Sequence, residues 1–98
     1  MKSQEKFKER VWNATKRIPC GKVSTYAMVA YSIGHAGAAR AVGNALNQNC
    51  NPEVPCHRVV RSGGFIGGFA HGSIKKVLLL QKEKVKITNN KVDPKHII

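Results

Sequence analysis

A thiol and an imidazole are direct neighbours at Cys56 and His57, within the run Pro55-Cys56-His57-Arg58. The thiolate is the nucleophilic form of cysteine, and a nearby imidazole or other positive charge lowers the thiol pKa and populates that form. Proline locks its own φ angle, so Pro55 gives the pair a stiff entry. A free cysteine is also commonly a small buried hydrophobic residue. By themselves the four residues favour that structural role, and the remaining sequence must decide.

Glu83 is the carboxylate that would complete such a pair. It falls at the end of a predicted helix, where the helix dipole favours cations over carboxylates. Lys82 and Lys84 flank it and can offset its charge, which is the simpler explanation. The functional alternative is that Glu83 turns inward to His57, giving a Cys–His–Glu relay.

Composition restricts the classes of function. The chain has 98 residues, and we expect residues 1–98 to form a single domain with one core. Seventeen Lys and Arg residues against five Asp and Glu residues give a net charge of +12, which is typical of a protein that binds a polyanion. A denser basic group between Lys75 and Lys86, which includes Lys76, is in part an ordinary solvated face.

The cysteines argue against two structural alternatives. Cys20, Cys50 and Cys56 are an odd number without Cys-x-x-Cys spacing, so the sequence predicts neither a disulfide framework nor a structural zinc site. The first residues are polar, and no apolar run is long enough to span a bilayer. We therefore expect a cytoplasmic protein with reduced thiols and no membrane contact, associated with the nucleoid or, in a eukaryote, nuclear.

Apolar residues at helical spacing predict three helices in the first half of the chain. The expected helices cover residues 7–18, which stop before Pro19, residues 26–33, with Ser24 or Thr25 as N-cap, and Ala38 to about Gln48. Short helices joined by a turn that contains Gly37, in a basic domain, suggest a helix-turn-helix.

The third predicted helix has an unusual outer face. If its larger apolar residues point inward, the side chains left toward solvent are mostly small and neutral: Ala39, Arg40, Gly43, Asn44 and Asn47. Small residues let a helix backbone approach another surface closely. That surface is either a DNA groove or another helix of the same protein, and the spacing alone favours neither.

The second half of the chain predicts shorter elements. Val59-Val60 indicates a strand, glycine pairs mark turns around residues 65–66, a fourth helix starts with Ser73 as N-cap, and residues 85–92 form a hairpin. Together the elements predict a mainly α fold, a helix-turn-helix, winged-helix-like DNA-binding domain with short strands and a hairpin.

Taken in order, the motifs resemble those of the O6-alkylguanine-DNA alkyltransferases, also called methylated-DNA–protein-cysteine methyltransferases. The resemblance begins at Phe7 and covers nearly the whole chain. It is carried by IPCGKVSTY at residues 18–26, AARAVG at 38–43, PCHRVV at 55–60 and the helix end at 78–83. Because several motifs occur in the family's order and at its separations, they form a specific signal.

The resemblance implies that Cys56 irreversibly accepts an alkyl group from O6 of a damaged guanine, so that each molecule reacts once. In the family the histidine, here His57, is the base and acts through a bridging water, while Glu83 orients its imidazole. Tyr26 would donate its hydroxyl proton to the departing guanine, and Asn49 would hold the active-site turn together. Without the resemblance, Tyr26 is simply a tyrosine at the core edge, and Asn49 an ordinary turn residue.

The resemblance also implies a partner, which is double-stranded DNA carrying O6-alkylguanine. It would be bound through its minor groove by a monomer that needs no cofactor or metal. A side chain cannot reach an atom stacked inside a duplex, so the damaged nucleotide has to rotate out. Arg40 would fill the vacated space, with Ala39, Gly43, Asn44 and Tyr26 against the groove. A lone helical arginine is otherwise most often solvated or bound to a phosphate.

Residues 65–70 would wall the lesion pocket, and Val59, Phe69 and Ala70 are its expected contacts. Three features depart from the family pattern. Phe69 stands where many members have tyrosine, and the loop that begins at Asn49 is one residue shorter and lacks a proline. We also expect the chain to lack the N-terminal domain of many members.

Two rival interpretations remain. An alkyltransferase-like protein would bind the lesion without repairing it. Such proteins commonly carry tryptophan in place of the nucleophile, so the presence of Cys56 favours repair. A helix-turn-helix regulator would recognise a DNA sequence and not damage, and Cys56 would then be structural.

Overall fold

The computed structural model describes residues 6–49, 51–66 and 70–98. Its helices are α1 (Phe7–Lys16), α2 (Tyr26–Ser32), α3 (Ala39–Asn47) and α4 (Ala70–Lys82). Its strands are β1 (Ser24–Thr25), β2 (Val59–Val60), β3 (Ile87–Thr88) and β4 (Lys91–Val92), and its 3-10 turns are η1 (Cys56–Arg58), η2 (Ser62–Gly64) and η3 (Pro94–His96). The predicted mainly α fold with short strands and a hairpin is confirmed. Within these ranges, every helix is too short or too polar to traverse a lipid bilayer.

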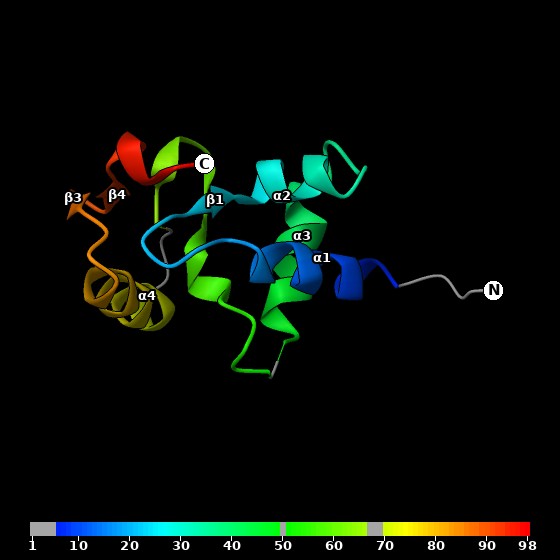
Figure 1. Cartoon of the computed structure of the whole chain (residues 1–98), viewed down its shortest axis with the longest axis horizontal. Helices are drawn as coiled ribbons and strands as arrows, with labels where there is room; N and C mark the ends of the chain where they lie inside the picture. Colours follow the sequence, from blue (N-terminus) through cyan, green and yellow to red (C-terminus); the bar gives the residue numbers. More distant parts are fainter. Residues whose placement is uncertain (1–5, 50, 67–69) are drawn as a thin grey trace.

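The fold has two halves, with α1, α2 and α3 in one and α4 with the β3–β4 hairpin in the other (Figure 1). Each half has its own cluster of buried apolar side chains. The first cluster includes Val11, Ile18, Val29, Val42, Leu46 and Val59. The second consists of Val23, Val60, Ile66, Leu80, Val85 and Val92.

Strand β2 connects the two halves. It pairs in parallel with β1, with Ser24 opposite Val59 and Thr25 opposite Val60. Because successive side chains of a strand point to opposite faces, Val59 enters the first cluster and Val60 the second, and neither has any exposed surface. The η1 turn, which carries the thiol and the imidazole, directly precedes this strand. Its position is therefore set by both clusters, through Val59 and Val60.

Several predicted boundaries are confirmed and others are corrected. The Thr25 hydroxyl accepts the backbone N–H of Met28 at 3.1 Å, so Thr25 is the N-cap of α2. Helix α1 ends at Lys16 and not at Ile18, although Ile18 is still buried in the first cluster. Helix α4 begins at Ala70, so Ser73 lies inside it and is not its N-cap.

The segment that carries the thiol and the imidazole is a turn and not a strand. In an extended segment, Cys56 and His57 would point to opposite sides. The Cys56 N–H instead donates to the Val54 carbonyl at 2.8 Å, and the Arg58 N–H to the Pro55 carbonyl at 2.9 Å, which closes a 3-10 turn. The turn directs consecutive side chains around its axis, and this lets both His57 and Arg58 reach one partner.

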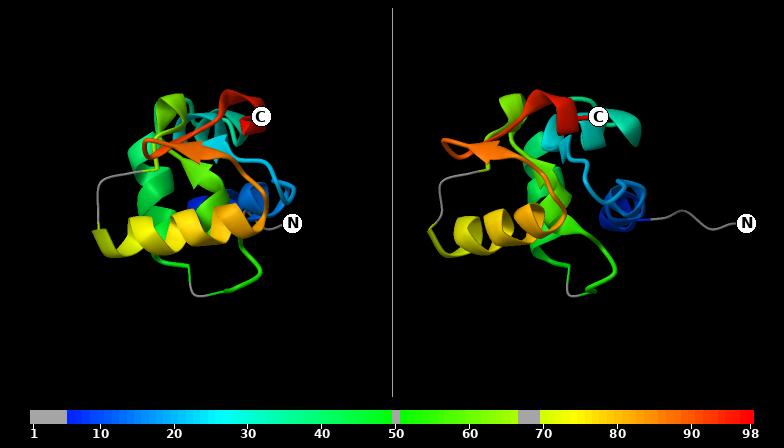
Figure 2. Two further views of the ribbon diagram at one scale, coloured as in Figure 1. Left: turned by 90° about the vertical axis from the view of Figure 1, so that its left-hand side faces the viewer. Right: turned by 60° about the vertical axis from the view of Figure 1, so that its left-hand side comes forward.

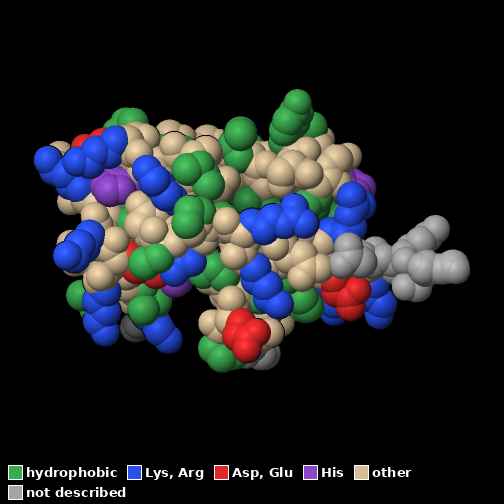
Figure 3. Space-filling view, viewed as in Figure 1, with side chains coloured by type: hydrophobic (Ala, Val, Ile, Leu, Met, Phe, Trp, Pro, Cys, Tyr) green, Lys and Arg blue, Asp and Glu red, His purple; other side chains and the backbone are tan. Residues whose placement is uncertain are grey.

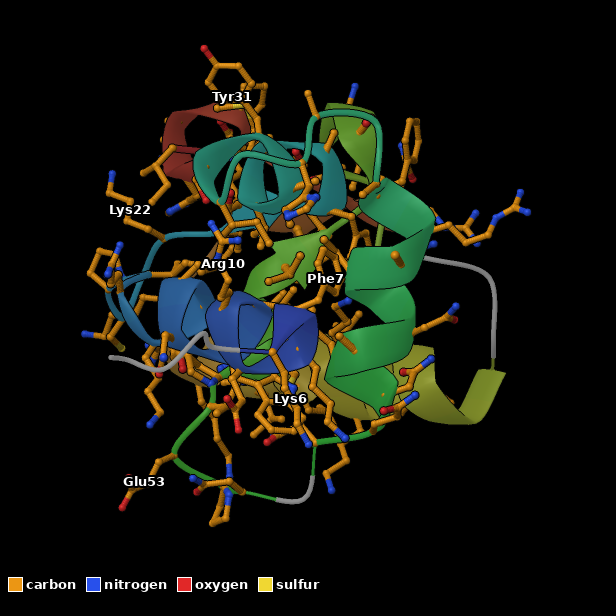
Figure 4. The ribbon with its side chains drawn as sticks, turned by 90° about the vertical axis from the view of Figure 1, so that its right-hand side faces the viewer. Lys6, Phe7, Arg10, Lys22, Tyr31 and Glu53 are labelled. Atoms are coloured by element: carbon orange, nitrogen blue, oxygen red, sulfur yellow. The ribbon has the colours of Figure 1, made fainter. Side chains whose placement is uncertain are left out.

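Side chains of α1 fix the angle between the helices of the first half. Arg10 extends from α1 toward the end of α2 and donates to the Ile33 carbonyl at 2.6 Å (Figure 4). Trp12 donates from Nε1 to the Ala45 carbonyl of α3 at 2.9 Å. Helix α1 is thereby tied to both helices of the predicted helix-turn-helix.

Gly64 provides a test of how tightly the hairpin closes on the η2 turn. Its φ angle is +90°, and a Cβ atom there would lie 3.0 Å from the Val92 carbonyl oxygen. Gly37 has the same φ but no atom within 4 Å of such a Cβ. We expect Gly37→Ala to cost about 1 kcal/mol of unfolding free energy, and Gly64→Ala about 2–4 kcal/mol because steric overlap adds to the backbone strain. Urea denaturation measures both, and equal losses would contradict the close contact.

Candidate active site

The carboxylate of Glu83 ties the η1 turn to the end of α4. Its Oε2 contacts His57 Nε2 at 2.7 Å, and Arg58 donates from Nε to Oε1 and from Nη2 to Oε2, both at 2.9 Å. Arg58 also donates from Nη1 to the Ile18 carbonyl at 2.8 Å, which joins the segment after α1 to the same network. The predicted contact between Glu83 and His57 is therefore present. Arg58 is a third member that the sequence reasoning did not single out.

The network determines how its members are protonated. Burial alone would raise the Glu83 pKa, but hydrogen bonds from Arg58 and His57 outweigh burial and lower that pKa to about 2. Because an ionised carboxylate only accepts hydrogen bonds, Nε2 of His57 carries a proton. In a neutral imidazole the free lone pair is then on Nδ1, which leaves His57 able to act as a base.

Glu83→Gln tests this network through stability. We expect a loss of about 2–3 kcal/mol at pH 7, because Arg58 loses an ionised acceptor. The folded-state pKa of Glu83 is depressed from 4.5 to about 2, so its stabilising effect is complete above 4.5 and is lost as the pH falls toward 2. The difference between wild type and variant should therefore shrink in urea denaturation at pH 2.5.

The matched control for that experiment is Glu53→Gln, on the exposed loop after α3 (Figure 4). It removes the same charge from a site without the network, and we expect a change within about 0.5 kcal/mol. A Glu83→Gln deficit that stays constant between pH 7 and pH 2.5 would show that the carboxylate charge is not what holds η1.

The thiol of Cys56 is half-buried at the edge of the first cluster. Its Sγ lies 3.8 Å from the Leu46 carbonyl oxygen, and Asn49 donates from Nδ2 to Sγ at 3.5 Å. The same Asn49 amide donates to the Asn51 carbonyl at 2.9 Å and accepts the Asn51 N–H at 3.1 Å. Asn49 thus connects the thiol to the loop that precedes it, in the position that the sequence resemblance gave it.

The environment of the thiol corrects our expectation about its acidity. We expected a neighbouring positive charge to lower the Cys56 pKa. Burial has the largest effect and raises that pKa above its ordinary value, while the Asn49 hydrogen bond and the Lys76 cation act in the opposite direction without overcoming it. The thiol is therefore mostly protonated at neutral pH and needs a base before it can act as a nucleophile.

Lys76 lies against the hydroxyl of Tyr26. Its Nζ donates to the Tyr26 hydroxyl oxygen at 3.2 Å and sits 5.4 Å from the centre of the ring. Burial lowers the Lys76 pKa to about 8, and burial also raises the Tyr26 pKa, which nearby Arg61 partly opposes. Because the ammonium group occupies a lone pair of the hydroxyl oxygen, the tyrosine proton remains available to a third group.

Lys76 is a site residue that the sequence reasoning missed, because we grouped it with a solvated basic face. A signal was nevertheless present. Lys76, Leu80 and Glu83 are spaced i, i+4 and i+7, so Glu83, directly after α4, continues the helix face of Lys76 and Leu80, and Leu80 is completely buried. The neighbouring Lys75 is exposed, as the solvated interpretation requires.

Lys76→Met should make the thiol less reactive, because it removes the cation that opposes the raised Cys56 pKa. We expect iodoacetamide to alkylate Cys56 about 2–3-fold more slowly at pH 7, because Lys76 is the weakest of the influences that lower the Cys56 pKa. The gap from wild type should narrow as the pH rises through about 8, where Lys76 itself loses its proton. Peptide mass spectrometry of Cys56 gives the rate separately from that of the exposed Cys20.

Lys75→Met is the control for that measurement, since it removes an equal charge from the exposed neighbour. We expect Cys56 in the control variant to react at the wild-type rate. Equal slowing by the two substitutions would indicate a general charge effect and not a specific one from Lys76.

A shallow groove with a volume of about 340 Å³ lies beside Tyr26. It is lined by Tyr26, Ala27, Ala39, Arg40, Arg61 and Ser62. The predicted buried side of α3 is confirmed by Val42, Ala45 and Leu46. On the predicted outer face, Arg40, Asn44 and Asn47 are exposed, whereas Ala39 and Gly43 are partly covered. Gly43 faces the Tyr26 ring, since a Cβ atom at Gly43 would lie 3.8 Å from ring atom Cε1.

We expected Val59, Phe69 and Ala70 to contact the lesion. Val59 is completely buried in the first cluster, so its side chain does not face an open surface. Phe69 lies outside the described residues. Ala70 is the first residue of α4.

Positive charge is widespread on the surface. Lys and Arg side chains are spread over the face seen in Figure 3, where acidic side chains are few. Among the residues that the structure describes, no three His, Cys, Asp or Glu side chains meet in a group that could hold a metal ion.

Comparison with known proteins identifies one group of relatives. Residues 6–85 match the profile described as 6-O-methylguanine DNA methyltransferase, DNA binding domain. The methylated-DNA–protein-cysteine methyltransferase of Salmonella typhimurium is 45% identical over 78 residues, which are 79% of this chain and 46% of the relative. That of Methanosarcina acetivorans is 46% identical over 78 residues, 79% of this chain and 50% of the relative. The chain spans about half the length of these curated relatives.

Solved structures with the same fold include complexes with DNA. S. pombe Atl1, in complex with damaged DNA containing O6-carboxymethylguanine, is 31% identical with a TM-score of 0.87, and the match covers 99% of this chain and 98% of that one. Mycobacterium tuberculosis OGT, in complex with DNA, is 42% identical with a TM-score of 0.75, covering 84% of this chain and 52% of that one.

Proposed function

This chain belongs to the 6-O-methylguanine DNA methyltransferase family, and from that premise we propose that it transfers an alkyl group from O6 of guanine in duplex DNA to its own Cys56. The observation that carries the proposal is the 2.7 Å contact between His57 and Glu83. His57 lies in the η1 turn, which begins with the half-buried Cys56. The relatives that are named methylated-DNA–protein-cysteine methyltransferases support it.

The first step is the activation of the thiol. Its raised pKa means that a base has to remove the proton, and the free Nδ1 of His57 supplies one, through a bridging water as the sequence resemblance implies. The imidazolium that forms keeps its Nε2–H directed at the ionised Glu83, which stabilises the new positive charge. Arg58 holds that carboxylate in place.

The second step is alkyl transfer. The Cys56 sulfur forms a bond to the alkyl carbon while the bond from that carbon to O6 breaks, and the electron pair of the broken bond stays on the guanine. Tyr26 donates a proton to this leaving group. Its hydroxyl proton is available because Lys76 occupies the oxygen lone pair, and the nearby ammonium also stabilises the resulting phenolate. The thioether product has no good leaving group, so each molecule reacts once.

The surface around Tyr26 supports the binding of a rotated nucleotide. The sulfur cannot reach an atom inside an intact stack, so the nucleotide must leave the duplex. Arg40 lines the groove beside Tyr26 and is exposed, which suits it to fill the vacated space. The small outer face of α3, with Ala39, Gly43 and Asn44, suits close approach to a minor groove. We further propose that the protein acts as a monomer.

Lesion binding without transfer is the second candidate. Two observations favour it: the end-to-end match with S. pombe Atl1, crystallised with O6-carboxymethylguanine DNA, and the raised thiol pKa. Both candidates require recognition of the damaged base, and they differ only in whether a covalent bond forms at Cys56.

Incubation with a duplex that contains O6-methylguanine separates the two candidates. We expect mass spectrometry to find one methyl group on the Cys56 peptide, with no more than one transferred per molecule. Cys56→Ala should abolish transfer and keep the preference for the damaged duplex. Cys20→Ala is the cysteine control: it removes the exposed thiol that interacts with Arg58, and we expect it to keep transfer to Cys56.

The other outcomes identify the alternatives. Preference for the damaged duplex with an unmodified Cys56 peptide would establish lesion binding without repair. Equal affinity for damaged and undamaged duplexes, together with strong dependence on base sequence, would establish a regulator in which Cys56 is structural.

A further inference from the structure

The last residues of the chain form a structure that lies beyond the family match, which ends at residue 85. Strands β3 and β4 pair with Ile87 opposite Val92 and Thr88 opposite Lys91, and the turn between them uses Asn89 and Asn90 at φ angles of 53° and 63°. Left-handed angles at both positions are those of the tight type I′ hairpin turn. The hairpin is therefore a compact, well-defined element.

The hairpin is attached to the wall of the candidate site. Ile66 donates its N–H to the Asn90 carbonyl at 3.0 Å, and Phe65 forms a β-bridge with Lys91. Arg61 in turn donates its N–H to the Phe65 carbonyl at 2.9 Å. Backbone hydrogen bonds thus run from the hairpin to Arg61, which lines the groove that Arg40 and Tyr26 also line.

The hairpin and α3 lie toward the same side of the molecule. In the left view of Figure 2, the turn of the orange hairpin, the green α3 and the start of the yellow α4 are all on the left. A duplex laid along this side would pass both α3 and the hairpin, which lie apart along the long axis of the molecule (Figure 1).

The hairpin carries a cation, Lys91, whose position is restricted. Lys91 is exposed, and its Nζ lies 5.3 Å from the centre of the Phe65 ring, a contact that restricts an otherwise mobile side chain. Phe65 is itself 48% exposed, which is high for a large apolar side chain in a single domain. Arg61, also exposed, provides a second cation at the groove itself.

The geometry points to a second DNA contact, in which Arg61 and Lys91 bind backbone phosphates of the duplex beside the stretch held by α3. The inference rests on the proposed function, because it takes duplex DNA as the partner. Phosphate contacts fix the position of a protein on the duplex without reading its sequence. Such a contact would hold the groove over a lesion while the nucleotide rotates out.

The test is the salt dependence of binding to an undamaged duplex. Each phosphate contact contributes about −0.9 to the slope of log K against log salt concentration. We expect the double variant Arg61→Gln with Lys91→Gln to lose about 1–2 units of slope relative to wild type, measured by fluorescence anisotropy. Thermal unfolding of the variant verifies that the hairpin remains folded.

The matched control removes two charges from the exposed surface of α1, by Lys8→Gln with Lys16→Gln. We expect its slope to change by much less, because α1 contacts α3 at the buried Ala45, whereas the groove is lined by Ala39 and Arg40. Equal slopes for the two double variants, or a wild-type slope in the Arg61 and Lys91 variant, would overturn the inference. Because this duplex carries no lesion, the result does not depend on whether Cys56 accepts an alkyl group.

Discussion

The partly buried carboxylate of Glu83 is the constraint on which the rest of the site depends. It accepts hydrogen bonds from two consecutive residues, His57 and Arg58, and Arg58 also holds the carbonyl of Ile18. One anion therefore joins the end of α4, the η1 turn and the segment after α1. An acceptor with a pKa of about 2 stays ionised at any physiological pH, so the proton on His57 Nε2 and the lone pair on Nδ1 are fixed by the same contact that holds the fold together.

The turn that carries the thiol is positioned from both sides. Val59 and Val60 follow it directly and anchor it in two different hydrophobic clusters, because strand geometry sends them in opposite directions. The first cluster includes residues of α2 and α3, which line the groove, and the second includes Leu80 of α4. A displacement of either half would therefore move Cys56 relative to Tyr26 or His57 relative to Glu83. The two residues of β2 are enough to anchor the turn because both of their side chains are completely buried.

Burial raises the pKa of the thiol and lowers that of Lys76, and both shifts favour the uncharged form. The thiol of Cys56 and the amine of Lys76 can thus exchange protons at neutral pH. The sulfur is not permanently ionised, and it is therefore protected from reaction with other electrophiles. The net charge of +12 would attract the proposed DNA partner at long range, independently of this local chemistry. Local desolvation controls reactivity, whereas surface charge controls encounter.

The sequence by itself determined the mainly α fold, a cap at Ser24 or Thr25 and the buried side of α3, because helical periodicity is a local property. The pairing of His57 with Glu83, 26 residues apart, was favoured only by the family resemblance. Tertiary structure alone decided the 3-10 form of η1, the roles of Arg58 and Lys76, and the direction of the Cys56 pKa shift. These depend on which atoms surround a side chain and how much water they exclude. Lys75 and Lys76 show the reason: they are identical in type and adjacent in the chain, yet one is solvated and the other contacts Tyr26, because a helix turns each successive residue by about 100°.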